Sequence, residues 1–376
     1  MFSKKTNQKL NFFPKKSFSD VFNSNNNKIK VIDLFCGIGG LSHGFVIENF
    51  NVVAGIDTDI SCKFAFEKNN NAKFISDSIV DVGAKELNKL YEGAKIKVLV
   101  GCAPCQNFSS YMFKDKEKES SKWTLLYEFS RIIEETRPEI VSMENVAQLL
   151  NFKKAPVFED FINNLKKQGY YISYEVVNCP DYGIPQNRKR LILLASKLGA
   201  INLIPKTHTK NDYVTVKDTI GSLAEINDGE KNIKDPFHLS RKLSPINKIR
   251  IKATPYGGSW KDWDDDLRLV CHKKASGKSY PSVYGRMLWE KPSPTMTTHC
   301  IGYGNGRFGH PVQNRAISLR EAALLQTFPI NYEFAENINS INTTVIARQI
   351  GNAVPVKLGQ VVAKSIKEHL MKYGAL

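Results

Sequence analysis

The sequence has no run of about eighteen apolar residues, the length that a membrane-spanning helix needs, so we expect no transmembrane segment. Residues 1–20 contain no continuous apolar stretch, and we expect no secretory signal there. Internal repeats are absent as well. The seven cysteines are odd in number and dispersed, which argues against a disulfide framework and for a reducing compartment. We therefore expect a cytoplasmic protein that makes no membrane contact.

Positive charge is what the sequence has in excess. It contains 53 lysines and arginines against 37 acidic residues, a net charge of +16 over 376 residues. Such a balance favours a polyanionic partner, most often nucleic acid. A general bias toward lysine, asparagine and isoleucine would give the same excess, so charge alone leaves both interpretations open.

Strand and helix patterns alternate over the first half of the chain. The apolar runs that we expect to be strands lie at 29–35, 50–57, 97–101, 140–143, 171–178 and 190–196. This alternation predicts a mostly parallel α/β sheet. We divide the chain into a mobile N-terminal tail, a catalytic and cofactor-binding domain, a smaller irregular domain, and a segment that returns to the catalytic domain, at 1–28, 29–204, 205–312 and 313–376.

A glycine-rich turn, CGIGG at Cys36–Gly40, follows the first predicted strand. Such a turn lets a ligand approach the backbone, but Ser42 stands where a dinucleotide fingerprint has its third glycine. Asp57, at the end of the second strand, is suited to hold a ribose diol, and Asp77 to accept from an adenine amino group. We expect an adenosine-containing ligand, which S-adenosylmethionine fits better than NAD. A plain glycine turn with two surface aspartates is the alternative.

The stretch Cys102-Ala-Pro-Cys105 directly follows an apolar run. A redox dithiol would need a thioredoxin-like helix start, whereas residues 106–123 are typical of a mobile charged loop. A zinc site would need a second ligand pair, which the dispersed histidines do not supply, and we expect no metal. We favour a single nucleophile, Cys105, because Pro104 fixes the backbone before it, and we expect Cys102 to pack against the strand.

Two further stretches place polar side chains beside the ends of strands. MENV puts Glu144 at the end of one strand, and GIPQNRKR puts Arg188 and Arg190 just before another. In a parallel sheet, ligands gather at the carboxyl ends of the strands. A buried glutamate near a thiol is a candidate proton donor, and arginines would bind a carbonyl oxygen or favour the thiolate.

These blocks together resemble the DNA (cytosine-5)-methyltransferase family. The matching stretches, in order, are DLFCGIGGLSHGF, GCAPCQNFS, MENV, DYGIPQNRKR, SLREAALLQTFP and QIGNAVP. The resemblance covers about 29–200 and 281–370. It implies the S-adenosylmethionine-dependent methyltransferase fold, which is Rossmann-like, with 205–312 as the target recognition domain. It also implies methyl transfer to C5 of a flipped-out cytosine in duplex DNA through a covalent Cys–C6 adduct.

The resemblance further assigns individual roles. Cys105 would attack C6, Glu144 would protonate or hydrogen-bond ring N3, and Arg190 would contact O2 with support from Arg188. The residues that would bind the cofactor are Phe35, Gly37, Ile38, Gly40, Asp57, Thr58, Asp77, Ser78, Pro104, Leu125 and Asn352. Thr58 departs from the family, because an apolar or aromatic residue often packs on adenine at that position.

Two other functions stay open: a tRNA cytosine-5 methyltransferase of the same fold and a catalytically silent DNA-binding regulator. The large basic region 205–312 favours double-stranded DNA, since base readout needs a dedicated surface. The intact Cys105 and Glu144 argue against a silent regulator. We expect a monomer. The sequence reveals neither the DNA target nor whether a cognate restriction endonuclease accompanies the protein.

Overall fold

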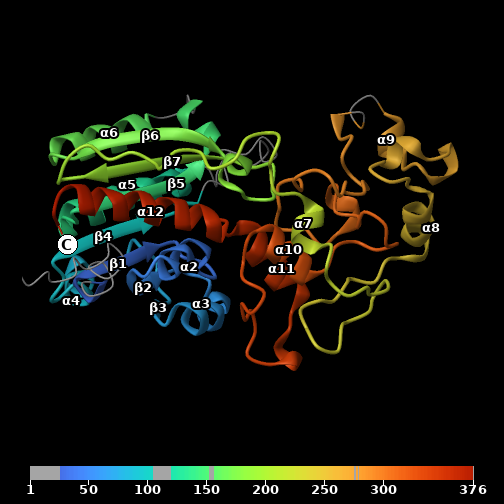
Figure 1. The fold of residues 1–376 in the computed structure, drawn as a ribbon, viewed down its shortest axis with the longest axis horizontal. Coiled ribbons are helices and arrows are strands. Elements are labelled where there is room, and N and C mark those ends of the chain that lie inside the picture. The colour runs from blue at the N-terminus through green and yellow to red at the C-terminus, as the bar shows by residue number, and fades with distance from the viewer. Residues whose placement is uncertain (1–25, 105–119, 152–155, 275–276, 278, 376) are drawn as a thin grey trace, which may run out of the picture.

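The computed structural model describes residues 26–104, 120–151, 156–274, 277 and 279–375. A mixed sheet with helices on both faces forms one lobe, and an irregular lobe with short helices extends from it (Figure 1). The strands of the sheet are β1 (Ile29–Leu34), β2 (Asn51–Ile56), β3 (Lys73–Ile75), β4 (Ile96–Gly101), β5 (Ile140–Val146), β6 (Tyr171–Asn178) and β7 (Lys189–Ser196).

The strand order is β3-β2-β1-β4-β5-β7-β6. Strands β1 to β5 pair in parallel, whereas β7 runs antiparallel to both β5 and β6. The connection changes direction between the neighbours β1 and β4, which makes their carboxyl ends a topological switch point. Ligands of open α/β sheets bind at such points.

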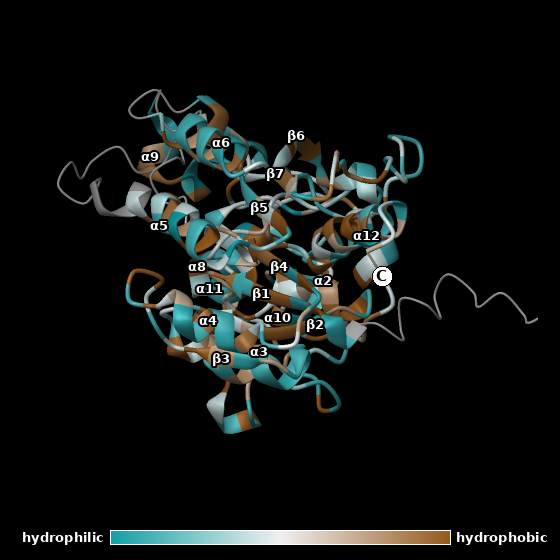
Figure 2. Ribbon diagram, turned by 90° about the vertical axis from the view of Figure 1, so that its left-hand side faces the viewer, coloured by the Kyte–Doolittle hydropathy of each residue, from teal (hydrophilic) through white to brown (hydrophobic). Residues whose placement is uncertain are grey.

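Helices cover both faces of the sheet, so its central strands are mostly apolar. One face is covered by α2 (Gly40–Ile47), α3 (Lys63–Asn70) and α12 (Val356–Lys372), and the other by α4 (Ala84–Leu90), α5 (Ser120–Thr136) and α6 (Val157–Lys167). Val31 and Val98 pack toward the first face, and Ile32 and Leu99 toward the second. Figure 2 shows hydrophobic residues concentrated along the central strands and hydrophilic ones on the outer helices.

The C-terminal helix α12 packs closely on the first helix, α2. A Cβ atom on Gly44 would lie 2.6 Å from the Cα atom of Gly359, and one on Gly359 would lie 2.6 Å from the carbonyl oxygen of Leu41. Neither glycine can gain a side chain without pushing the two helices apart. The end of the chain is thereby attached to its beginning, beside the strand that leads to the cavity.

The second lobe contains helices and irregular segments. Its α-helices are α7 (Val216–Ile220), α8 (Pro245–Ala253), α9 (Val270–Lys273), α10 (Leu319–Leu325) and α11 (Thr343–Asn352). The 3-10 helices of the molecule are η1 (Asn26–Lys28), η2 (Ile60–Cys62), η3 (Ala147–Asn151), η4 (Cys179–Tyr182), η5 (Trp260–Asp262), η6 (Asp265–Leu267), η8 (Tyr303–Asn305) and η9 (Ile338–Ser340). A small core of its own, around Ile251, Trp260, Trp263 and Tyr303, stabilises this lobe.

The predicted fold class, a mostly parallel α/β sheet with a Rossmann-like arrangement, is confirmed. Strand β5 runs to Val146, beyond the predicted end at Met143, because its last residues pair with β7 up to Arg190. The predicted tail 1–28 lies almost entirely outside the described residues. Among the helices that the structure describes, none combines the length and the apolar character that a membrane crossing requires.

Candidate active site

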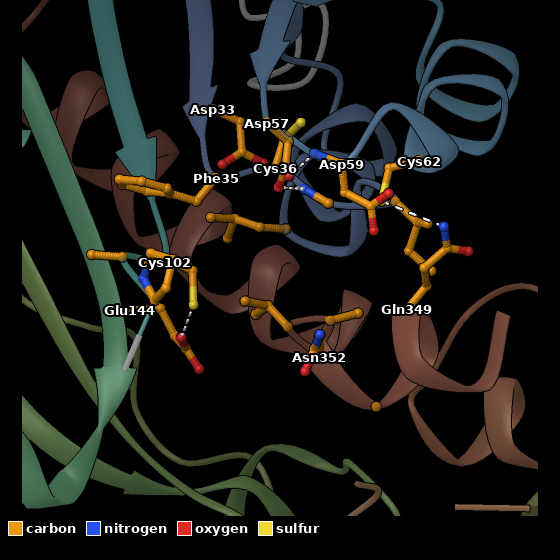
Figure 3. A pocket seen from close by; sticks show the side chains of 18 of the residues that line it. Asp33, Phe35, Cys36, Asp57, Asp59, Cys62, Cys102, Glu144, Gln349 and Asn352 are labelled. Carbon is orange, nitrogen blue, oxygen red and sulfur yellow. Dashed lines mark hydrogen bonds between the residues drawn. The ribbon is translucent and has the colours of Figure 1, made fainter. Parts of the chain in front are cut away.

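A cavity of about 520 Å³ opens at the carboxyl ends of β1, β2, β4 and β5, which is the topological switch point (Figure 3). Its walls come from the turns that follow these strands, from the start of β7, and from the end of α11 with the residues after it. Segments from both ends of the chain therefore share one cavity.

The turn after β1 presents its backbone to the cavity. Gly37 has a φ of +51°, and a Cβ atom added there would meet nothing within 4 Å, so the space beside it is open to a ligand. Its N–H donates to Asp57 Oδ2 at 2.9 Å. Gly39 has a φ of +85°, and a Cβ there would lie 2.3 Å from the Asn70 side chain. Glycine is thus required at position 39 by sterics and suits position 37 because a ligand can approach.

Two acidic side chains lie at this end of the cavity. Asp57 accepts hydrogen bonds from the N–H groups of Gly37 and Asp59, and burial raises its pKa. Asp33 accepts from Ser42 Oγ at 2.6 Å, while its other oxygen, Oδ1, has no hydrogen-bond partner among the described residues. Burial, with the neighbouring Asp57 charge, raises the pKa of Asp33 to about 7. This end of the cavity therefore fits a ligand that offers hydroxyl or ammonium donors.

Glu144 lies at the opposite end and is only 3% exposed. Its Oε1 lies 2.9 Å from Arg190 Nε in an ion pair, and its Oε2 accepts from the Cys102 thiol, with an S–O distance of 2.7 Å. Figure 3 shows Cys102 and Glu144 facing each other across the sheet edge. The arrangement gives a buried carboxyl group two different partners, one on each oxygen.

Arg188 ties this end of the cavity to distant segments. Its guanidinium donates to the carbonyl oxygens of Met296 and Ala353, each at 3.4 Å. Burial, together with the charge of Arg190, lowers the pKa of Arg188 to about 10. The side chain remains cationic at neutral pH and anchors the second lobe beside Glu144.

The structure brings most of the predicted site residues together. Those that line the cavity are Phe35, Gly37, Ile38, Asp57, Thr58, Pro104, Glu144, Arg188, Arg190 and Asn352. Those that do not are Gly40, Asp77, Ser78 and Leu125. Gly40 begins α2, and Leu125, on α5, is partly buried and packs against the core. Cys105 and the residues up to 119 lie outside the described part of the chain, so the role of Cys105 stays a prediction.

Cys102 packs against the core, as we expected, but it is only half-buried. It also lines the cavity, where its thiol bonds to Glu144, because β4 ends at Gly101 and Cys102 lies one residue past the strand.

Several further cavity residues are missing from our sequence analysis, among them Arg348, Gln349 and Asp59. Arg348 on α11 forms an ion pair with Asp59 at 2.8 Å, and the neighbouring Gln349 donates to Ser61 Oγ at 2.9 Å. These contacts attach α11 to the turn that carries Asp57. The only sequence signal was that Arg348 and Gln349 directly precede or begin the QIGNAVP block. Among the described residues, no group of three or more His, Cys, Asp or Glu side chains is placed to hold a metal ion.

The sheet, with its antiparallel β7 and its cavity at the switch point, has the fold of S-adenosylmethionine-dependent methyltransferases. A crystal structure of a prophage-encoded DNA modification methyltransferase from E. coli matches it with a TM-score of 0.69 at 21% identity, covering 92% of this chain and 99% of that one.

The sequence comparisons identify the family, whereas the structural match identifies the fold. The family model for C-5 cytosine-specific DNA methylases matches residues 29–368. Type II methylase M.HgiDII of Herpetosiphon aurantiacus is 56% identical over 90% of this chain and 95% of its own length. Type II methyltransferase M1.BsuMI of Bacillus subtilis is 32% identical over 89% of this chain and 79% of its own. The chain therefore belongs to the C-5 cytosine-specific DNA methylase family, whose members are DNA (cytosine-5)-methyltransferases.

Proposed function

We propose that this enzyme transfers a methyl group from S-adenosylmethionine to C5 of a flipped-out cytosine in a short duplex DNA target. The observation that carries the proposal is the placement of Glu144. It is a buried carboxyl group, paired with Arg190, in the same cavity as the glycine turn and Asp57. A proton donor for a base and a site for an adenosine-containing ligand thus adjoin each other.

The cavity residues fit the cofactor, which supplies an electrophilic methyl group on a sulfonium when bound. Open space beside Gly37 admits the ligand, and Asp57 offers carboxylate oxygens to a ribose diol. Asp33 Oδ1 has no hydrogen-bond partner among the described residues, so it can accept from a donor on the ligand. We propose that the binding residues are Phe35, Gly37, Ile38, Gly40, Asp57, Thr58, Asp77, Ser78, Pro104, Leu125 and Asn352.

Cytosine C5 is a weak nucleophile, and the proposed chemistry activates it. The Cys105 thiolate adds to C6 while Glu144 gives a proton or a hydrogen bond to N3, so that electron density moves to C5. Transfer of the methyl group to C5 would break the sulfonium–methyl bond and leave a neutral thioether on the cofactor product. A base would then remove the C5 proton, and the C–H electron pair would restore the C5–C6 double bond as the thiolate leaves and N3 returns its proton to Glu144. Positioned general acids of this kind contribute roughly 10²–10⁴-fold to a rate.

Arg190 and Arg188 serve the base in this scheme. We propose that Arg190 contacts O2 of the cytosine and that Arg188 supports it, since both line the cavity beside Glu144. A base reaches such a site only outside the duplex, which costs a few kcal/mol of unstacking.

The second lobe supplies the surface for duplex DNA. We propose residues 205–312 as the target recognition domain of a monomeric enzyme, supported by the overall net charge of +16. Because two relatives named above are Type II enzymes, we also propose that the protein works in a restriction-modification system, opposite a cognate endonuclease.

Bisulfite sequencing of DNA from cells that express the protein tests the function. We expect complete protection of one cytosine within a short recurrent sequence, and no protection in cells that express Cys105→Ala. Unmodified DNA beside newly methylated tRNA cytosines would instead establish the tRNA enzyme. Unmodified nucleic acid of both kinds, with intact DNA binding, would establish a silent regulator.

A further inference from the structure

We propose that Cys102 is a positioning residue that decides which oxygen of Glu144 faces the base. The inference rests on the proposed function, in which Glu144 acts on N3 of the cytosine. It concerns a thiol three residues before the proposed nucleophile, with a separate task. Cys102 touches neither the reacting carbon nor the cofactor in this scheme, and it acts through Glu144.

The two oxygens of Glu144 have different surroundings. Oε2 accepts from the Cys102 thiol at 2.7 Å. Oε1 lies 2.9 Å from Arg190 Nε, yet within the described part of the chain no donor is aligned to form a hydrogen bond with it. Oε1 is therefore the oxygen with bonding capacity left over for a ligand in the cavity.

This asymmetry fixes the orientation of the carboxyl group. The Cys102 thiol holds Oε2, so Oε1 is the oxygen left to face a ligand, with the Arg190 guanidinium beside it. A carboxyl group without the thiol partner can rotate and exchange its oxygens. Cys102 thus keeps Oε1 turned toward N3.

The charged and titratable groups around Glu144 come from three directions. Arg190 lies on β7, and Arg188 directly precedes that strand. Cys102 follows β4, and Cys179 lies in η4. Burial raises the pKa of the Cys179 thiol to about 11, so this group stays neutral near pH 7. Both arginines favour the ionised carboxylate. Replacing Cys102 removes one donor and leaves the formal charges of this cluster unchanged near neutral pH.

Three variants separate positioning from packing. Cys102→Ala removes the donor, and Cys102→Ser restores one. Val98→Ala is the matched control, because it truncates a buried side chain on β4, the strand that leads to Cys102, without touching Glu144. Each is assayed for kcat, for cofactor binding by calorimetry, and for the rate of covalent trapping on duplex DNA with 5-fluorocytosine at the methylated position.

For Cys102→Ala we expect kcat and the trapping rate to fall about tenfold, with unchanged cofactor affinity, and Cys102→Ser to recover most of both. The split between rate and affinity supplies the second readout, because lost positioning lowers kcat and the trapping rate together while cofactor affinity stays unchanged. Val98→Ala should lower the melting temperature and leave kcat and the trapping rate in place.

Two results would overturn the proposal: wild-type rates in Cys102→Ala, or a loss of rate in Cys102→Ala that Cys102→Ser does not restore. The second result would assign Cys102 to packing alone. Failure of the proposed function has a different signature, because wild type itself would then trap no 5-fluorocytosine DNA.

Discussion

Replacing Arg315 by methionine should test how the second lobe is held together. The Arg315 guanidinium binds both carboxylate oxygens of Glu321 at 2.7 Å, and both side chains are fully buried. The same carboxylate accepts from the N–H of Ser318 at 2.7 Å, at the start of α10. Arg315→Met therefore leaves the buried Glu321 carboxylate with neutral hydrogen-bond donors such as the Ser318 N–H. The only other basic group near it is the His310 ring, 3.8 Å away, among the described residues.

The expected loss of unfolding free energy is about 3–5 kcal/mol, the usual cost of removing one partner from a buried ion pair. Burial acts to raise the pKa of Glu321, but the bonds and charge of Arg315 outweigh it, so the net pKa is lowered. A lowered pKa gives stability that is present above the unfolded value and lost as pH falls. In Arg315→Met the Glu321 carboxylate loses the arginine, and burial then favours its protonated form. The difference in unfolding free energy between the variant and wild type should therefore shrink as the pH falls.

The assay is denaturant unfolding of the DNA-free and cofactor-free protein between pH 7 and pH 5. Arg348→Met is the matched control, since its ion pair with Asp59 joins side chains that are 48% and 37% exposed. Such a pair contributes only about 0–1 kcal/mol. A loss below about 1 kcal/mol in Arg315→Met, or a loss that does not change with pH, would refute the reasoning.

Three further outcomes follow from the site. Asp57→Ala should weaken S-adenosylmethionine binding about tenfold or more in calorimetry, while NAD that binds more tightly than S-adenosylmethionine to the wild type would contradict the cofactor assignment. Affinity for duplex DNA should fall steeply and linearly on logarithmic axes as salt rises; affinity that is independent of salt would rule out phosphate contacts as its main source. Cys105→Ala should bind DNA and cofactor yet trap no 5-fluorocytosine DNA, whereas Cys102→Ala should still trap it, more slowly; trapping by Cys105→Ala would disprove the choice of nucleophile.

Strand patterns carry the part of the fold that sequence predicts well. Val31 and Ile32 alternate between two buried faces, and such short apolar runs are visible without partners. The end of β5 is different, because its last residues become strand only through pairing with β7. A contact made by a distant segment leaves no local signal, and Met143 therefore looked like the end of the strand.

The same distinction applies to the site. Gly37 and Asp57 follow strands and Glu144 lies near the end of one, so all three could be predicted from their position. Asp33 sits inside a strand pattern, and nothing local reveals that Ser42 of α2 meets its carboxyl group. The partners Asp59 and Arg348 lie 289 residues apart, so only the folded chain brings them to one cavity.

The attachment of α11 and α12 to the N-terminal part of the fold also determines when the cavity is completed during synthesis. The cavity needs residues near Asn352 and Val354, which are synthesised long after the turn that follows β1. At a synthesis rate of about 5–20 residues per second, the interval between them is several tens of seconds. A nascent chain therefore has its sheet strands well before it has a closed cavity. A chain that stops before Asn352 lacks part of the cavity wall, and we expect it to bind no cofactor.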